Sequence, residues 1–369
     1  SLTDLPSGNP ALPPEAFAQV VSEAGLTPIV HLTGKDGNRN SLEGRLHLLA
    51  RLGVESVLAL TGDAQREGFQ GQSKPVYDFD SVLIVCLVQA MREGLEYRRG
   101  KRSLRTTPFD FLPGAVVNPF KVGEPDQLLQ FYKMELKIAV GASFIITQLG
   151  FNLRKLYELK QYMNREGLQD APVIANVYVP TVFVAKMMKQ GLIAGTVASD
   201  ELIDRLGSES KAERLERAAN MVAAVRDLGF SGAHLGGFGL THDDFHWITR
   251  RADELGDGWK NRVDDLIFEY PGEFYLFPKG ADGLSDGDGE YQISDSIPRA
   301  KLKQTFSRQV HRLLIKEGSM GARFLAPRLK SAGEGFETSG FWQRALGLSR
   351  WYRKATLGCM DCGDCIQDH

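Results

Sequence analysis

The chain has 369 residues, in which 44 Lys and Arg oppose 46 Asp and Glu, so the formal net charge is −2 at pH 7. This near balance argues against a protein that mainly coats nucleic acid or an anionic membrane surface. Hydrophobic residues make up 43% of the chain and charged residues 24%, a globular composition that excludes extended disorder. Only four cysteines are present, and no apolar run approaches the roughly 20 residues of a membrane span, so we expect a cytoplasmic protein.

Short β-rich runs alternate with helical runs over the first 240 residues, a pattern typical of βα units. Strands are predicted at 1–3, 28–32, 56–60, 111–117, 144–148, 173–179 and 232–236, and helices at 14–24, 41–52, 80–94, 124–140, 152–166, 211–228 and 241–255. Small or polar residues follow several strands, as at the barrel face where active sites lie. We therefore predict an α/β fold with a (β/α)8 TIM barrel over 1–256, and a doubly wound sheet is the alternative.

Seven strands are predicted, one fewer than the eight of a closed (β/α)8 barrel, and the first begins at Ser1, the first residue of the sequence. An open seam would leave unpaired strand edges, so we expect a further strand and helix upstream of Ser1. After the barrel we expect a linker and loop region at 257–297, which contains the Gly- and Asp-rich run GADGLSDGDGEY. A helical C-terminal domain is predicted at 298–369.

The chain ends in a cysteine cluster with C-x2-C-x2-C spacing, formed by Cys359, Cys362 and Cys365. Thiolates at this spacing share a metal in zinc sites and in iron–sulfur clusters, and the spacing does not choose between the two. The fourth ligand would be His369 or a residue further downstream. The alternative interpretation is a set of reduced surface thiols. Cys86 lies inside an apolar helix and is expected to be a packed core thiol.

Three predicted strand ends carry polar side chains that suit a heterocyclic ligand, namely His31 in HLTGKD, Asp63 in LTGD and Gln148 in TQ. A histidine at a barrel mouth can donate to a ring nitrogen or a carbonyl. A carboxylate can accept two hydrogen bonds from an amidine-like edge such as that of a pterin, and a glutamine offers both a donor and an acceptor. The structural alternatives are a core histidine, a helix-capping aspartate and a loop-stabilising amide.

Two basic features suit an anionic ligand. Lys133 and Lys137 lie one turn apart on a predicted helix and share a face, which could meet a diphosphate or simply be solvated. The run YRRGKRSLR at 97–105 could attract a polyanion or form a solvated loop. The sequence contains no phosphate-binding glycine fingerprint and no nucleophile elbow.

Four barrel motifs, LTDLPSGNP, PIVHLTGKD, VLALTGD and GASFIITQ, occur in this order and together resemble the methylenetetrahydrofolate reductase family. The terminal GCMDCGDC resembles the start of the cysteine-rich region that follows the barrel in one bacterial subgroup. The two resemblances cover roughly 1–255 and 295–369. They imply a (β/α)8 barrel with a flavin, usually FAD, over the C-terminal strand ends.

The resemblance also implies a chemistry. NAD(P)H reduces the flavin, which passes hydride to the methylene carbon of 5,10-methylenetetrahydrofolate and yields 5-methyltetrahydrofolate. Asp63 and Gln148 match the positions that bind folate and take part in catalysis. The flavin-contacting positions of the family are matched by a larger set, Thr3, His31, Leu60, Thr61, Gly62, Lys133 and Lys137.

The sequence departs from the family pattern in several places. The acidic residue that protonates the folate stands on the first strand of the family and has no counterpart here, so the general acid is not named. Thr61 stands where the family often has Arg, and Gln130 and Leu136 replace Asp or Arg near the flavin phosphates. FMN, or direct hydride transfer without flavin, therefore stays open.

Three functional interpretations follow. The first is a flavin-dependent methylenetetrahydrofolate reductase of one-carbon metabolism and methionine biosynthesis. The second is a non-catalytic or electron-transfer subunit, in which the barrel is a scaffold and the cysteine domain holds a metal cluster or docks a partner. The third treats the C-terminal helices only as an oligomerisation or docking module. A homo-oligomer or an electron-transfer partner is compatible with these interpretations, and the choice between NADH and NADPH is not readable.

Overall fold

The computed structural model describes residues 1–65, 71 and 73–294. The chain divides into two units, Ser1–Ile293 and Ser294–His369. The predicted C-terminal helices and the three terminal cysteines lie outside the described residues. The first unit is built on six parallel strands, β1 (Ile29–Thr33), β2 (Ser56–Leu60), β5 (Leu112–Val117), β6 (Phe144–Thr147), β7 (Val173–Val179) and β8 (Gly232–Gly237).

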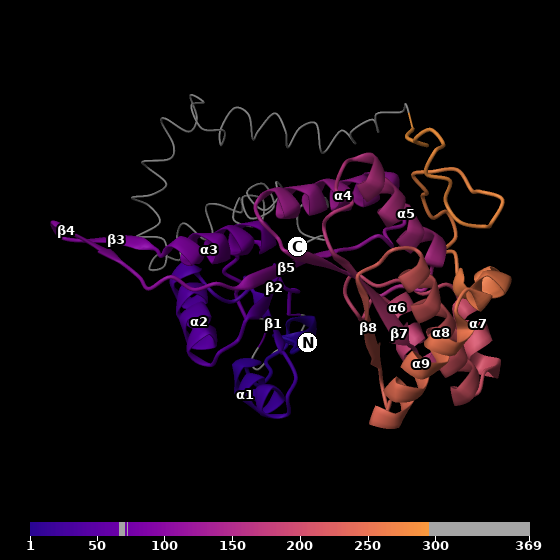
Figure 1. Cartoon of the computed structure of the whole chain (residues 1–369), viewed down its shortest axis with the longest axis horizontal. Coiled ribbons are helices and arrows are strands. Elements are labelled where there is room, and N and C mark those ends of the chain that lie inside the picture. Colours follow the sequence, from indigo (N-terminus) through magenta and orange to yellow (C-terminus); the bar gives the residue numbers. More distant parts are fainter. Residues whose placement is uncertain (66–70, 72, 295–369) are drawn as a thin grey trace, which may run out of the picture. The chain divides into compact units, whose positions relative to one another are not determined.

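Neighbouring strands of this sheet follow one another in the chain, in the order β1-β2-β5-β6-β7-β8 (Figure 1). A doubly wound sheet reverses its strand order at a switch point, so that alternative is wrong. The two edge strands approach each other, because Leu2 forms a parallel bridge with Val30 of β1 while the Ser1 hydroxyl lies 3.0 Å from Nε2 of His234 in β8. The sheet is therefore curled into a half-barrel, which confirms the predicted α/β, TIM-like fold in part.

Three features differ from the predicted elements. The strand predicted at 1–3 is reduced to the single bridge at Leu2, so the described main sheet has six strands rather than seven. Two short helices after β7 were missed, α6 (Val182–Lys189) and α7 (Asp200–Ser208). The antiparallel hairpin of β3 (Glu96–Arg99) and β4 (Arg102–Arg105) was also missed, because its residues are all exposed and show no hydrophobic alternation.

The other helices lie close to their predicted ranges. They are α1 (Glu15–Glu23), α2 (Arg39–Arg51), α3 (Ser81–Glu93), α4 (Glu124–Ala139), α5 (Leu153–Arg165), α8 (Lys211–Asp227) and α9 (His242–Leu255). Polar caps begin several of them directly after a strand or its loop. Asp80 accepts a hydrogen bond from the N–H of Leu83, and Asn152 accepts one from the N–H of Lys155. These caps order the loops at the carboxyl ends of the strands.

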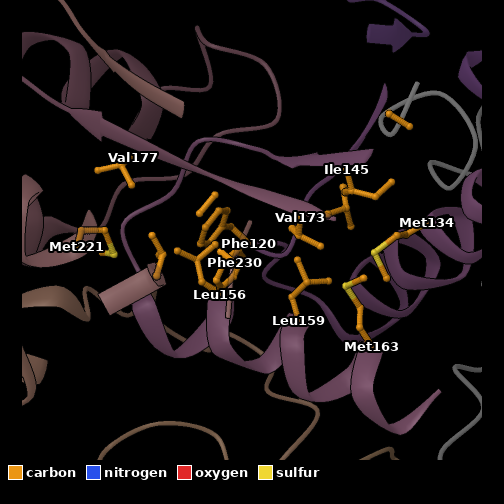
Figure 2. Close-up of a cluster of buried hydrophobic side chains, with 14 of the residues drawn as sticks. Phe120, Met134, Ile145, Leu156, Leu159, Met163, Val173, Val177, Met221 and Phe230 are labelled. Carbon is orange, nitrogen blue, oxygen red and sulfur yellow. The ribbon is translucent and has the colours of Figure 1, made fainter. Parts of the chain in front are cut away.

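The hydrophobic core lies between the sheet and its helices. Figure 2 shows Leu156, Leu159 and Met163 on one face of α5, beneath Ile145 of β6 and Val173 of β7. All five side chains are fully buried. Burying an aliphatic side chain of this size contributes roughly 1.5–3 kcal/mol. This layer therefore holds β6 in place and sets the position of Gln148, which follows β6 directly.

Residues 257–293, expected as a linker and loop region, are part of the packed core of the first unit. Their only helical segment is the 3-10 stretch η2 (Gly258–Leu266). Trp259, Phe277 and Leu284 are buried in the same hydrophobic cluster as the sheet. The apolar residues scattered through this Gly- and Asp-rich segment were too irregular to predict this packing.

A buried ion pair within α5 includes the carboxylate that binds this segment. Nζ of Lys155 lies 3.3 Å from Oε1 of Glu158, and both side chains are 0% exposed. The other Glu158 oxygen accepts hydrogen bonds from the N–H groups of Leu276 and Phe277, at 2.8 and 3.2 Å. Burial raises the pKa of Glu158 and lowers the pKa of Lys155, so each charge depends on the partner and donors around it.

We expect Glu158→Gln to lower the free energy of unfolding by about 3 kcal/mol, because it leaves the Lys155 ammonium buried without its counter-charge. Urea unfolding followed by circular dichroism measures the change. The matched carboxylate-to-amide control is Asp200→Asn, since the Asp200 side chain is 72% exposed and should tolerate the change. An equal and small effect of both substitutions would contradict a structural role for the buried pair.

Candidate functional site

The carboxyl ends of the six parallel strands lie at one edge of the curled sheet, and most of the predicted site residues lie on these strands, directly after them, or on a helix packed against them. His31 lies in β1, Leu60 ends β2 and Gln148 follows β6. Lys133 and Lys137 lie on α4, which packs against β5. The fold therefore brings the predicted residues from four separate parts of the chain to neighbouring strands.

The segment before β1 is attached to this edge through Asp4, which sequence reasoning missed. One oxygen of the buried Asp4 carboxylate accepts hydrogen bonds from the N–H and the hydroxyl of Thr33, at 2.9 and 2.8 Å. The same oxygen lies 2.9 Å from Nη1 of Arg45. Thr3, the predicted flavin contact in this segment, is exposed. The aspartate of the LTD motif thus holds the segment while its threonine stays accessible.

The end of β2 has a turn that requires glycine. Gly62 has a φ of +91°, and a Cβ there would lie 3.0 Å from Cβ of Lys35 and 3.1 Å from Cβ of Thr33. The hydroxyl of Thr61 accepts a hydrogen bond from the N–H of Ser81 at 3.1 Å, so it supports the start of α3. These two residues therefore have structural roles that do not need a flavin.

Asp63 is half-buried after this turn. The 3-10 turn η1 (Pro6–Gly8) packs on its main chain, since a Cβ on Gly8 would lie 2.4 Å from the Asp63 carbonyl oxygen. Burial, followed by the negative charges of Asp63 and Asp36, raises the pKa of Tyr77. Tyr77 therefore stays a protonated phenol at physiological pH. Tyr77 was not predicted from the sequence.

His31 is half-buried, and neither of its ring nitrogens has a hydrogen-bond partner among the described residues. Burial, with a smaller contribution from His234, lowers the pKa of His31 to about 4, whereas the charge of Asp4 opposes the shift. His31 is thus neutral at physiological pH. A neutral imidazole offers one donor and one acceptor to a ligand.

Two more polar side chains with buried, unpartnered atoms lie on neighbouring strands. Asn176 of β7 and His234 of β8 face each other in the parallel register. Within the described part of the chain, Oδ1 of Asn176 and Nδ1 of His234 have no hydrogen-bond partner. Sequence reasoning missed both. The available signal was a polar residue in the middle of each short apolar strand.

Gln148 is half-buried, and its side-chain amide has a defined orientation. Its Oε1 accepts a hydrogen bond from the N–H of Leu149 at 2.9 Å, which directs Nε2 away from the main chain. A Cβ on Gly195 would lie 3.0 Å from this Nε2. The amide predicted to bind folate therefore lies between its own strand end and the segment that connects α6 to α7.

The two predicted lysines of α4 differ in their environment. Nζ of Lys137 donates a hydrogen bond to the Val116 carbonyl at 2.8 Å. Burial, and then the charge of Lys133, lowers the pKa of Lys137 to about 8, whereas Asp80 opposes the shift. Nζ of Lys133 is buried and has no partner among the described residues. Lys137 is thus held by the fold, and Lys133 is the cation that a ligand could pair.

Gln130, which replaces an acidic or basic residue of the family pattern, faces the protein. Its Oε1 accepts a hydrogen bond from the N–H of Asn118 at 3.2 Å, and its side chain is buried. The substitution therefore supports the loop after β5. Leu136 is partly exposed on the same helix.

The basic run 97–105 lies away from this edge. It forms the β3–β4 hairpin, which follows α3 and precedes β5, so it leaves the sheet where β5 begins (Figure 1). The carboxyl ends of the strands are at the opposite end of the sheet. The arginines of the hairpin are therefore not part of the candidate site.

The predicted metal ligands, Cys359, Cys362 and Cys365, remain a prediction because they lie outside the described residues. Over residues 1–65, 71 and 73–294, no group of three or more His, Cys, Asp or Glu side chains is arranged to bind a metal ion. Cys86 is a half-buried free thiol on α3. None of the helices in the described ranges is long and apolar enough to cross a membrane.

Comparison with known proteins supplies the family. The sequence model of the family described as methylenetetrahydrofolate reductase matches residues 3–236. The chain belongs to the methylenetetrahydrofolate reductase family. The matched range contains the strand ends and α4, with His31, Asp63, Lys133 and Gln148, and it ends before the segment that packs on α5. The motif-based resemblance is confirmed, and the chain is a member of a folate reductase family.

No curated protein matches the chain significantly. Among solved structures, an uncharacterized protein from Clostridium thermocellum that binds two copies of 5-methyl-5,6,7,8-tetrahydrofolic acid has 12% identity and a TM-score of 0.44, with 68% of this chain and 80% of that chain covered. Apo-MsnO8 has 13% identity and a TM-score of 0.35, with 71% of this chain and 84% of that chain covered.

The half-buried His31, whose two ring nitrogens are buried, makes the free energy of unfolding depend on pH in a defined window. Its pKa is about 4 in the folded protein against 6.5 for an ordinary histidine, so the unfolded chain takes up the extra proton between these values. The contribution of His31 to the free energy of unfolding is up to about 3 kcal/mol. It is fully present above pH 6.5 and is lost as the pH falls towards 4.

We expect His31→Gln to flatten the fall of the unfolding free energy between these pH values, as measured by urea unfolding at a series of pH values. The exposed His246 of α9 provides the matched control, and His246→Gln should leave the slope unchanged. An unchanged slope in His31→Gln would show that the imidazole is not desolvated in the folded protein.

Proposed function

We propose that this member of the methylenetetrahydrofolate reductase family is a cytoplasmic, flavin-dependent enzyme of one-carbon metabolism. It reduces 5,10-methylenetetrahydrofolate to 5-methyltetrahydrofolate with NAD(P)H as the electron donor. The observation that carries the proposal is that the ring nitrogens of His31 and Nζ of Lys133 are buried and have no hydrogen-bond partner among the described residues. Buried polar groups normally have partners, so these two indicate a ligand that the described chain does not supply.

The two groups fit a flavin nucleotide in different ways. The neutral His31 ring can donate to a carbonyl or accept from an N–H of a flat heterocycle. The Lys133 ammonium suits a phosphate or diphosphate, with Lys137 behind it on the same helix. When bound, a flavin accepts hydride from a nicotinamide and delivers hydride to a carbon acceptor. Leu60 at the end of β2 and the exposed Thr3 are also proposed to contact the ring.

The folate side of the site is proposed to use Asp63 and Gln148. A carboxylate at Asp63 can accept two hydrogen bonds from the 2-amino and N3 positions of a pterin. Gln148 offers its Nε2 as a donor, and its Oε1 keeps a lone pair beside the bond from Leu149.

A second candidate function rests on the cysteine cluster. C-x2-C-x2-C spacing is that of a zinc site or an iron–sulfur cluster, so Cys359, Cys362 and Cys365 are proposed to hold a metal. In this alternative the chain is a non-catalytic or electron-transfer subunit, and the barrel serves as a scaffold. Metal analysis of the full chain, with visible spectra before and after flavin removal, distinguishes zinc from an iron–sulfur cluster.

The full-length protein tests the proposal directly. We expect visible flavin absorbance that bleaches when NADH or NADPH is added and recovers with 5,10-methylenetetrahydrofolate. Asp63→Asn should slow this recovery more than it weakens flavin binding, because the lost charge serves the pterin. A colourless protein without NAD(P)H oxidation would contradict the catalytic proposal, and equal losses of both functions in Asp63→Asn would make Asp63 structural.

We expect Lys133→Met to weaken FAD binding about 10- to 100-fold, since a hydrogen bond from a charged group contributes about 1.5–3 kcal/mol. The apo protein should keep its stability, because Nζ of Lys133 has no partner in the described part of the chain. Lys137→Met is the matched variant and should destabilise the apo protein, because it removes the bond to Val116. Fluorescence titration with FAD and urea unfolding measure both effects. Unchanged FAD affinity in Lys133→Met would contradict the role of this lysine.

A further inference from the structure

The segment that connects α6 to α7, residues 190–199, lies against the side-chain amide of Gln148. Gly195 is the point of contact. Its φ is +70°, a conformation that favours glycine, and a Cβ there would lie 3.0 Å from Nε2 of Gln148 and 3.7 Å from Nδ2 of Asn118. Both the positive φ and the close approach of the Gln148 amide therefore favour glycine at position 195.

Asn118, which follows β5, holds Gly195 in this position. Its Nδ2 donates a hydrogen bond to the Gly195 carbonyl at 2.8 Å, and its Oδ1 accepts one from the N–H of Phe120 at 3.0 Å. Its main-chain N–H donates to Gln130, and its carbonyl accepts from Gln127, both on α4. The Asn118 side chain is buried. With both ends of its amide in use and its main chain bound to α4, Asn118 has a single orientation.

The loop after β5 also packs on the loop after β6. A Cβ on Gly150 would lie 2.3 Å from the ring of Phe120, so the Phe120 ring lies directly on the Gly150 main chain. The loops that follow β5 and β6 and the segment after α6 therefore converge around one side chain, Gln148. None of the residues that join them was singled out from the sequence.

We propose that Asn118 is a positioning residue that fixes the Gln148 amide for folate through Gly195. Leu149 sets which end of the amide is the oxygen, because its N–H requires an acceptor. Gly195, held by Asn118, limits the space on the side of Nε2. Gln148 then presents one donor in one direction, and a pterin binds without the cost of ordering the amide. This inference rests on the proposed function and adds a residue that acts on the folate alone.

The decisive variant is Asn118→Asp. It keeps the shape of the side chain and the acceptor for Phe120 but replaces the donor to Gly195 with an oxygen, which repels the carbonyl. We expect the Kd for 5-methyltetrahydrofolate to rise about 3- to 10-fold, the range for a single hydrogen bond. The KM for 5,10-methylenetetrahydrofolate should rise in parallel with little change in kcat. FAD affinity and the rate of flavin reduction by NAD(P)H should stay unchanged.

A double-mutant cycle separates positioning from general damage. Because Asn118 acts through Gln148, Asn118→Asp should have no further effect on the folate Kd when Gln148→Ala is already present. Additive effects would overturn the proposal. Gly195→Ala should cause the same selective loss of folate affinity, and it decides the matter if Asn118→Asp does not fold. Asn164→Asp, an exposed asparagine at the end of α5, controls for the added charge.

The Kd for 5-methyltetrahydrofolate distinguishes a failure of the proposed function from a failure of the proposed role of Asn118. If the wild-type protein does not bind 5-methyltetrahydrofolate, the proposed function fails. If the wild-type protein binds it and neither Asn118→Asp nor Gly195→Ala changes the Kd, the proposed function stands and the role of Asn118 is overturned.

Discussion

All six strands that the structure describes in the main sheet run parallel, and this constraint arranges the rest of the first unit. Parallel neighbours cannot be joined by a tight turn, so a crossover must return the chain to the start of the next strand. Every strand therefore ends at the same edge of the sheet. His31, Asp63, Asn118 and Gln148 are distant in the chain and become neighbours of one edge for this reason alone. The position of the candidate site therefore depends first on strand direction and only then on individual side chains.

The polar groups near this edge fall into two classes. Thr61, Gln130 and Lys137 are satisfied within the protein, by the N–H of Ser81, the N–H of Asn118 and the carbonyl of Val116. His31 and Lys133 are buried with no such partner among the described residues. Burying an unpaired polar group is costly, so the second class is the more informative about ligands. The residues that the resemblance assigns to the flavin region are thus divided between those that support the loops and those whose polar atoms have no partner among the described residues.

The segment at 257–293 and the candidate site share the helix α5. Glu158 and Lys155 of this helix bind the segment from one side, and the cap residue Asn152 donates hydrogen bonds to Glu273 and Tyr275 at 2.9 and 2.7 Å. The helix begins a few residues after Gln148. The segment 257–293 therefore stabilises the start of α5 and, through it, the preceding loop, which carries the Gln148 amide predicted to bind folate.

Periodicity and motifs alone were sufficient to predict the βα alternation, most helix boundaries, the family, and His31, Asp63 and Gln148 as residues of strand ends. These are local properties, because apolar spacing, capping residues and strand-end motifs can each be recognised within a short stretch of the sequence. The sequence did not reveal Asp4, Asn118, Asn176, Gly195 or His234, nor the packing of 257–293. Each of these depends on a partner far away in the chain, such as Thr33 for Asp4 or Gly195 for Asn118. A polar side chain supports a loop when it has a hydrogen-bond partner within the protein, and it is available to a ligand when it has none. Only the tertiary structure decides this, because the partners are distant in the sequence.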